Sequence, residues 1–146
     1  MDQRAAEVRM REILLVEDLE SDAELLRRVL KAARVSNPIR HLMDGSEAFA
    51  YLKALENVDS RRATEIPSVL FLDLKLPGST GFEILRYLRD SSTFAGTLKF
   101  VVSDLRDMDG IRHAYALGAH SFVRKPVNAQ DLQELIKTYP KHWEIV

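Results

Sequence analysis

The chain has 146 residues, of which 46% are hydrophobic and 29% are charged, and its formal net charge is −1. This length and composition are typical of one globular domain with a proper core, and the charge gives no basic field that would favour nucleic acid or an anionic membrane. The absence of cysteine excludes disulfides, thiol catalysis and cysteine-ligated metals.

The sequence carries no signal for a membrane or for export. Its apolar runs are far too short to cross a bilayer, and no apolar segment follows residues 1–4 as it would in a signal peptide. We therefore expect a cytoplasmic protein that binds neither DNA nor membrane.

Short apolar segments alternate with segments of helical spacing along most of the chain. The predicted strands cover residues 12–16, 39–43, 68–73, 98–102 and 120–123. The predicted helices cover residues 23–33 (with a cap in 19–22), 79–90 and 106–117, and two more begin at residues 44–47 and after a cap at Asn128. Strict alternation of strand and helix predicts an α/β domain with a doubly wound sheet of five parallel strands and right-handed crossovers.

The sequence predicts one domain with short flanking segments. Residues 1–11 form an N-terminal extension, residues 12–138 the domain and residues 139–146 a C-terminal tail. Residues 56–65 have no apolar period and are predicted to be an exposed, mobile connection. The chain after Pro126 suffices for one helix and a tail, so we expect no output domain.

Charged residues follow three of the predicted strands. The segment before Asp73 is almost wholly apolar, which is typical of a strand buried on both faces, and Asp73 is expected at its carboxyl end, where open α/β sheets bind ligands. The first strand likewise runs into Glu17 and Asp18, and the last is followed by Lys125. Three carboxylates and an ammonium group at one edge of a sheet would suit a divalent cation and a phosphoryl group.

At this point the sequence resembles a known family. Glu17-Asp18, residues 73–81, Ser103 and Lys125-Pro126 are similar to the receiver domain of bacterial response regulators. The resemblance runs from about Ile13 to Lys137, and although each motif is common, their order at successive strand ends is specific. It implies a flavodoxin-like (receiver) fold with strand order 2-1-3-4-5, and a histidine kinase as the donor of a phosphoryl group.

The resemblance implies that Asp73 is the phosphoacceptor. It also implies a bound Mg²⁺ or Mn²⁺, with Asp18, Asp73 and the backbone carbonyl of Lys75 as direct ligands and Glu17 acting through water. The alternative is purely structural: Asp73 is then an acidic turn former, and Glu17 and Asp18 favour the dipole of the helix that follows them.

Three further residues complete the implied site. Lys125 would reach across to Asp73, with a cis peptide bond between Lys125 and Pro126; the alternative is a solvated lysine. The hydroxyl of Ser103 would bind a phosphoryl oxygen, and Phe122 would swing inward as that hydroxyl moves. A buried aromatic is also commonly plain core, and for Phe122 the two interpretations are compatible.

Two residues depart from the family's pattern and are expected to modulate the site. Asp104 stands where the family usually has a small residue, and it would either repel the phosphoryl donor or point to solvent and cap the fourth helix. Lys75 occupies a variable position whose side chain would overhang the pocket and would stabilise the phosphoryl group or steer water away.

The resulting prediction is a single-domain response regulator with no enzymatic activity beyond its own phosphorylation and dephosphorylation. The segment before Pro67 and the tail are loosely similar to regulators of phytochrome-type sensor kinases, which implies a homodimer through the last strand and helix, with an unknown downstream partner. Trp143 is then either an interface anchor or a side chain folded back on the last helix.

Three other functions stay open on the sequence alone. A receiver fold used only as a docking adaptor is one, and Asp104 is the feature that favours it. A phosphatase with an aspartyl nucleophile is another, although such enzymes usually need a second acid where Lys75 stands. A flavodoxin-like cofactor carrier is the third, but acids rather than a phosphate-binding loop follow the first strand.

Overall fold

The computed structural model describes residues 11–57, 66–104 and 106–146. Its central sheet has the strands β1 (Ile13–Val16), β2 (Ile39–Leu42), β3 (Val69–Leu72), β4 (Leu98–Ser103) and β5 (Ser121–Arg124). They lie in the order β2-β1-β3-β4-β5, and every neighbouring pair is parallel. The predicted fold class and strand order are therefore confirmed. Residues 1–10 and 58–65 lie outside the described residues. Of the predicted connection over 56–65, Glu56 instead ends a helix and Asn57 caps it.

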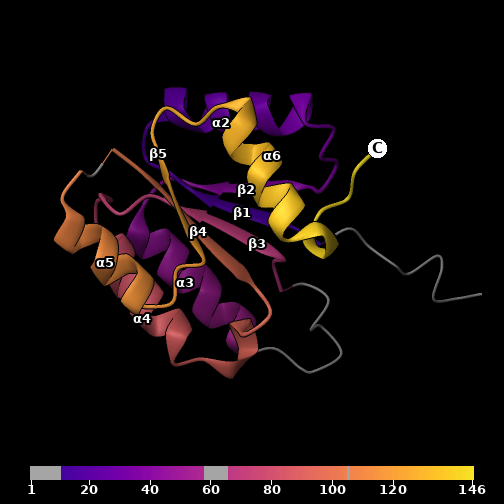
Figure 1. Ribbon diagram of the computed structural model, residues 1–146. Coiled ribbons are helices and arrows are strands. Elements are labelled where there is room, and N and C mark those ends of the chain that lie inside the picture. Colours follow the sequence, from indigo (N-terminus) through magenta and orange to yellow (C-terminus); the bar gives the residue numbers. More distant parts are fainter. Residues whose placement is uncertain (1–10, 58–65, 105) are drawn as a thin grey trace, which may run out of the picture.

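Helices cover both faces of this sheet. They are α2 (Glu20–Ala32), α3 (Gly45–Glu56), α4 (Gly81–Arg89), α5 (Met108–Ala116) and α6 (Ala129–Thr138), with short 3-10 turns η2 (Ser92–Phe94) and η3 (Pro140–His142). Figure 1 shows α2 and α6 on one face and α3, α4 and α5 on the other. Each face buries its own apolar cluster, because β1, β3 and β4 present alternate side chains to the two sides.

Polar side chains fix where most helices begin. Asp44, Thr80 and Asn128 each accept a hydrogen bond from the backbone N–H three residues later, so Asn128 caps α6 as expected. The predicted start of the first helix is wrong, because α2 begins at Glu20 without a side-chain cap. Asp107 caps α5, so of the two roles left open for Asp104 the capping role is excluded.

Trp143 lies in the core of the chain. Its side chain is 5% exposed and stacks on Phe100 with ring centroids 6.0 Å apart, and it packs 6.2 Å from the ring of Phe71. Its interpretation as an exposed interface anchor is therefore wrong, because the tail buries this ring against β3 and β4 instead of presenting it to a partner.

The last residues are held along the edge of the sheet opposite the strands' carboxyl ends. The N–H of Ser36 donates to the carbonyl of Glu144 over 2.7 Å, and the N–H of Glu144 donates to the side chain of Asn37 over 2.7 Å. The Ser68 hydroxyl donates to the carbonyl of His142. Since Asn37 and Ser68 precede β2 and β3, the tail closes the end of the sheet where these strands begin.

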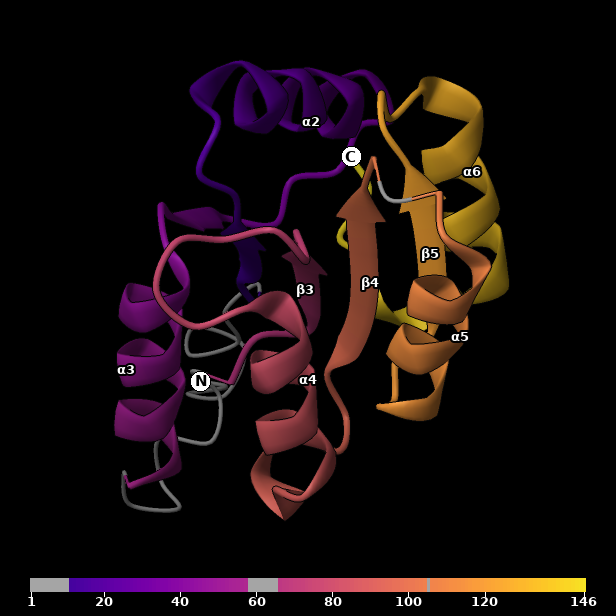
Figure 2. The same cartoon turned by 90° about the vertical axis from the view of Figure 1, so that its left-hand side faces the viewer.

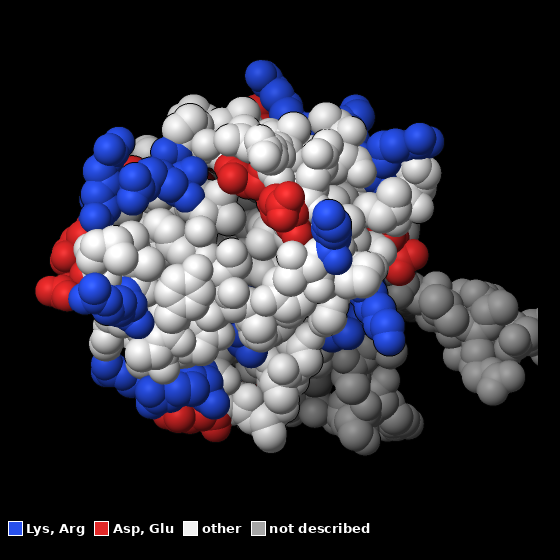
Figure 3. Space-filling view, in the orientation of Figure 1, with Lys and Arg blue, Asp and Glu red and all other residues white. Residues whose placement is uncertain are grey.

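The surface shown in Figure 3 has no single-sign field across it. Basic side chains stand mostly around the rim of this face, and acidic side chains lie both at the rim and in its upper central part. Of the helices in the described ranges, none combines the length and the apolar character that crossing a membrane requires.

Glycine at position 45 allows the loop after β3 to approach α3. The N–H of Gly45 donates to the carbonyl of Pro77 over 2.9 Å, and a Cβ at position 45 would lie far inside van der Waals contact with the Ser79 carbonyl oxygen. We expect Gly45→Ala to lower the free energy of unfolding by at least about 2 kcal/mol, because the loop that follows Asp73 must shift.

The matched control for this prediction is Gly96→Ala. A Cβ there meets no described atom within 4 Å, so its free energy of unfolding should stay within about 0.5 kcal/mol of the wild type. Urea unfolding followed by circular dichroism measures both variants, and equal effects would contradict the close approach as the cause.

Candidate functional site

The carboxyl ends of the strands meet at one edge of the sheet, at the top of Figure 2. Backbone hydrogen bonds continue between neighbouring segments of the chain beyond the strand ends. The N–H of Asp73 donates to the carbonyl of Val16 over 3.1 Å, and the N–H of Lys125 donates to the carbonyl of Ser103 over 3.0 Å. The residues after β3 are therefore held beside those after β1, and the residues after β5 beside the end of β4. The side chain of Lys125 reaches from there across the edge of the sheet to Glu17 and Asp73.

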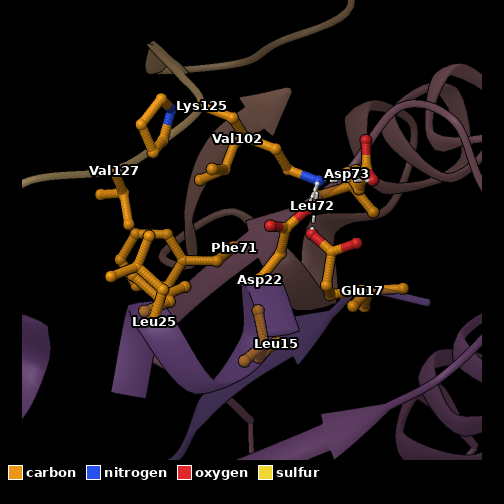
Figure 4. Close-up of a pocket in the computed structure, with 13 residues that line it drawn as sticks. Leu15, Glu17, Asp22, Leu25, Phe71, Leu72, Asp73, Val102, Lys125 and Val127 are labelled. Carbon is orange, nitrogen blue, oxygen red and sulfur yellow. Dashed lines mark hydrogen bonds and ion pairs between the residues drawn. The ribbon is translucent and has the colours of Figure 1, made fainter. Parts of the chain in front are cut away.

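Lys125 joins the acids of this site. Its Nζ lies 2.7 Å from Glu17 Oε1, 2.9 Å from Asp22 Oδ2 and 3.0 Å from Asp73 Oδ2, and Figure 4 shows the side chain pointing into this group of carboxylates. Burial alone lowers the pKa of Lys125, but the hydrogen bonds to the three carboxylates outweigh it and raise the pKa above its usual value. The bond to Pro126 is cis, as expected.

Asp22 is the residue that the sequence did not assign to the site. It lies in the first turn of α2, where an acidic side chain is ordinarily explained by the helix dipole. The signal available in the sequence was its place just after Glu17 and Asp18, on the helix that starts at the edge of the sheet where those acids lie. Its side chain is 33% exposed, so it forms the outer wall of the site.

Both oxygens of Asp73 are engaged within the chain. Oδ1 accepts a hydrogen bond from the N–H of Lys75 over 3.1 Å, and Oδ2 accepts one from Lys125. The residue is 6% exposed. The carboxylate is thus held in one orientation at the end of β3, which is the requirement for a group that must meet an incoming reactant along a defined line.

Glu17 is the most strongly perturbed acid of the site. Its side chain is buried, and Oε2 accepts a hydrogen bond from the N–H of Leu19 over 3.2 Å. Burial raises the pKa of Glu17 to about 7, with the charge of Asp73 adding to the rise and the hydrogen bond from Lys125 opposing it. Independently of this pKa, three carboxylates contact the one ammonium group of Lys125, so a single positive charge faces three acidic groups.

The acids offer a donor set for a hard cation. One oxygen from each of Glu17, Asp18 and Asp73 lies within 4.8 Å of the other two. Carboxylate oxygens are the ligands that Mg²⁺ and Mn²⁺ prefer, and a divalent cation would balance the excess negative charge around Lys125. The residues present fit such an ion.

Ser103 lies on β4, the neighbour of β3, and Phe122 lies on β5, the strand beyond it. Leu72 is paired with Val101, and Val101 is paired with Phe122. Ser103 is fully buried at the end of β4, at the same edge as Asp73. Phe122 is half-buried against the apolar cluster beneath α3, α4 and α5, so its ring belongs partly to the core.

Tyr115 is a second residue that the sequence did not single out. It projects from α5 and is 46% exposed, and its hydroxyl accepts a hydrogen bond from the N–H of Phe122 over 3.1 Å. This bond ties the exposed side of α5 to the strand that leads to Lys125.

The two residues that depart from the family's pattern contact each other. Lys75 Nζ lies 3.1 Å from Asp104 Oδ1, and both side chains are mostly exposed. The hydrogen bond and the charge of Lys75 lower the pKa of Asp104. Asp104 is thus paired across the loops that follow β3 and β4, and it does not stand beside the pocket as an uncompensated charge.

In sequence and fold the chain is similar to response regulators. The family model of the response regulator receiver domain matches residues 13–137. Response regulator Rcp1 of Synechocystis is 27% identical over 90% of this chain and 87% of its own length, and its Mn²⁺-bound crystal structure gives a TM-score of 0.71 at 25% identity, covering 93% of this chain and 99% of that one.

Two further solved structures cover nearly all of the chain. The bacteriophytochrome response regulator AtBRR is 30% identical with a TM-score of 0.75, covering 95% of this chain and 99% of its own. The phosphorylated cyanobacterial phytochrome response regulator RcpA is 29% identical with a TM-score of 0.71, covering 91% and 93%. With the family model spanning most of its length, the chain belongs to the response regulator receiver domains of two-component signalling.

Proposed function

We propose that the protein accepts a phosphoryl group on Asp73 from a histidine kinase and that this phosphorylation changes its affinity for a partner protein. One observation carries the proposal: the largely buried ammonium group of Lys125 binds Asp73 together with two further carboxylates at the edge of the sheet where ligands bind. Beyond its own phosphorylation and dephosphorylation, the protein catalyses no reaction. A cytoplasmic location stays a prediction from the sequence.

The chemistry requires a carboxylate to act as a nucleophile. An oxygen of Asp73 attacks the phosphorus of a phosphohistidine; the new P–O bond forms as the P–N bond breaks, and its electron pair returns to the imidazole nitrogen. Lys125, 3.0 Å from Asp73 Oδ2, is placed to offset the negative charge of the transferred group.

A divalent cation would assist this transfer. Mg²⁺ or Mn²⁺ held by Asp18, Asp73, the Lys75 carbonyl and, through water, Glu17 would supply positive charge against the phosphoryl oxygens. The oxygen donor set around Asp73 supports this assignment, as do the Mn²⁺-bound structure of Rcp1 and the phosphorylated structure of RcpA.

The change of shape on phosphorylation is assigned to the part of the sheet where β4 and β5 lie. The Ser103 hydroxyl would bind a phosphoryl oxygen, and Phe122 would move inward with it. The burial of Ser103 at the edge that carries Asp73 and the half-buried state of Phe122 support this. Phosphorylation then acts through the different affinities of a partner for the two arrangements.

Phosphotransfer separates the proposed function from its rivals. Incubation with a phosphorylated histidine kinase and Mg²⁺ should move label from the kinase to this chain, whereas a docking adaptor would take up none. A phosphatase would instead turn over a generic phosphate ester steadily. No transfer from any kinase, together with no mass increase in acetyl phosphate and Mg²⁺, would overturn the proposal.

The partner kinase is proposed to be a sensor kinase of the phytochrome type, and the protein is proposed to form a homodimer through β5 and α6. The likeness to AtBRR and RcpA supports the first of these proposals, the type of kinase. Phosphotransfer profiling against sensor kinases with and without phytochrome modules tests it, with faster transfer from the former as the expected result. Sedimentation velocity tests the second point, with a dimer at micromolar concentration as the expected result.

The pair of Lys75 and Asp104 is expected to set the rate of phosphorylation by small anionic donors. Replacing Asp104 by Asn leaves the positive charge of Lys75 unpaired near the site, so the rate with acetyl phosphate should rise about threefold at low salt; Lys75→Gln should lower it by a similar factor. Both effects should fade at high salt because the groups are exposed. Changes of the same sign in both variants would contradict an electrostatic origin.

A further inference from the structure

His41 lies behind the acidic pair, on the edge strand β2. It is paired with Leu15 in the sheet, and its ring reaches the end of β1, where Nε2 lies 2.8 Å from the carbonyl oxygen of Glu17. The other ring nitrogen, Nδ1, lies 3.0 Å from the NH2 nitrogen of Arg27 on α2. One imidazole therefore joins the helix to the backbone of the site.

The two partners of His41 determine the state of its ring. A guanidinium group has only donors, so Nδ1 must accept the hydrogen bond from Arg27; a carbonyl has only acceptor sites, so Nε2 must donate to Glu17. The pair of contacts is satisfied by the neutral ring with its proton on Nε2 and by no other form. The geometry thus assigns a single tautomer to His41.

The carbonyl that His41 binds belongs to the peptide bond between Glu17 and Asp18. A peptide unit is planar, so fixing its oxygen fixes the plane from which the main chain of Asp18 continues. Glu17 is anchored further by its own N–H, which donates to Leu42, whereas Asp18 lies in the bend that follows β1. The N–H of Leu19 also bonds to the Glu17 side chain across this bend, but the bond from His41 is the one made to the carbonyl of the peptide unit that links Glu17 to Asp18.

Arg27 is itself held in place on α2. Its NH1 lies 3.3 Å from Glu20 Oε1 and 3.6 Å from Glu24 Oε2. The guanidinium group is therefore directed by two acids of its own helix toward His41, and a line of polar contacts runs from the helix surface through the imidazole to the Glu17 carbonyl.

We propose that His41 is a positioning residue for the phosphorylation site: its Nε2–H fixes the peptide plane between Glu17 and Asp18 and so sets the two carboxylates for a divalent cation. The inference rests on the proposed function, because it concerns the same site. Groups that orient ligating carboxylates in this way affect metal affinity strongly although they do not touch the metal.

Mg²⁺ titration calorimetry on the full chain tests this role with three variants. His41→Leu removes both hydrogen bonds and should weaken Mg²⁺ binding about tenfold. His41→Gln keeps an N–H donor at a similar reach and should recover most of that loss. The control is Arg40→Leu on the same strand, which removes an ion pair to Glu12 on the edge of the sheet and should leave Mg²⁺ affinity unchanged.

Nitrogen NMR gives a second readout that needs no metal. In the wild type the ring of His41 should show an unprotonated Nδ1 and a protonated Nε2, and the amide resonance of Asp18 should shift in His41→Leu but not in Arg40→Leu. The inference is overturned if another tautomer is found, if the Asp18 amide is unmoved, or if His41→Leu binds Mg²⁺ as the wild type does. A wild type that binds no Mg²⁺ contradicts the proposed function instead, and the NMR result then decides on His41.

Discussion

Asp73→Asn is expected to leave the protein folded and to abolish uptake of a phosphoryl group. An amide keeps an oxygen that can accept the hydrogen bond from the N–H of Lys75, and it has nearly the shape of the carboxylate. It lacks the negative charge that makes the oxygen a nucleophile. Intact-mass spectrometry after incubation with acetyl phosphate and Mg²⁺ should show one added phosphoryl group on the wild type and none on the variant.

The matched control for this variant is Asp22→Asn. Asp22 contacts the same lysine nitrogen as Asp73, at 2.9 Å against 3.0 Å, but it stands on α2 at the outer wall of the site. We expect this variant to be phosphorylated. Phosphorylation of the Asp73 variant at the wild-type rate would show that another residue is the acceptor, and failure of both variants would show that the integrity of the Lys125 cluster, not the identity of the nucleophile, was being measured.

Lys125→Met should lower the free energy of unfolding more than any other single change at the site. The lysine is 14% exposed and lies between Glu17, Asp22 and Asp73, so its removal leaves buried carboxylates without a positive partner. Breaking a buried ion pair by removing one partner typically costs about 3 kcal/mol. Urea unfolding should show this loss without metal, and added Mg²⁺ should restore part of it, because a cation among the acids offsets their repulsion.

Lys75→Met provides the comparison from the same site. Its ammonium group is 63% exposed and pairs only with the exposed Asp104 among the described residues, so the loss should be less than about 1 kcal/mol. If the two lysines cost the same, the burial of Lys125 would not be the source of its effect. An unchanged stability of Lys125→Met would argue that the three carboxylates are already neutral in its absence.

The alternation of strands and helices and the charges at strand ends could be predicted from the sequence. Asp73, Glu17 and Lys125 were found because each directly follows an apolar run, and parallel strands bring their carboxyl ends to one edge. The starts of two helices cannot be predicted in this way. Glu20 precedes the apolar period of its helix, and Asp107 is one of several acids in its loop that could cap α5.

Contacts between distant segments could not be predicted in the same way. Asp22 and Lys125 are far apart in the sequence, and only the packing of α2 beside β5 and α6 brings them together. Lys75 and Asp104 each stand out in the sequence as departures from the family's pattern, but their pairing depends on how two loops lie relative to each other. The partners of His41 come from α2 and from a backbone carbonyl, so its place in the sequence gives no signal of its role.

Trp143 also gives the protein a built-in optical reporter. It is the one tryptophan in the sequence, and its ring rests on Phe71 and Phe100 in the apolar cluster that α2 and α6 cover. Its fluorescence should therefore change when the sheet unfolds and the tail leaves it. Phe71 stands on β3, two residues before Asp73, so this emission reports the folding of the strand that carries the site, while heat or mass reports the ligand bound there.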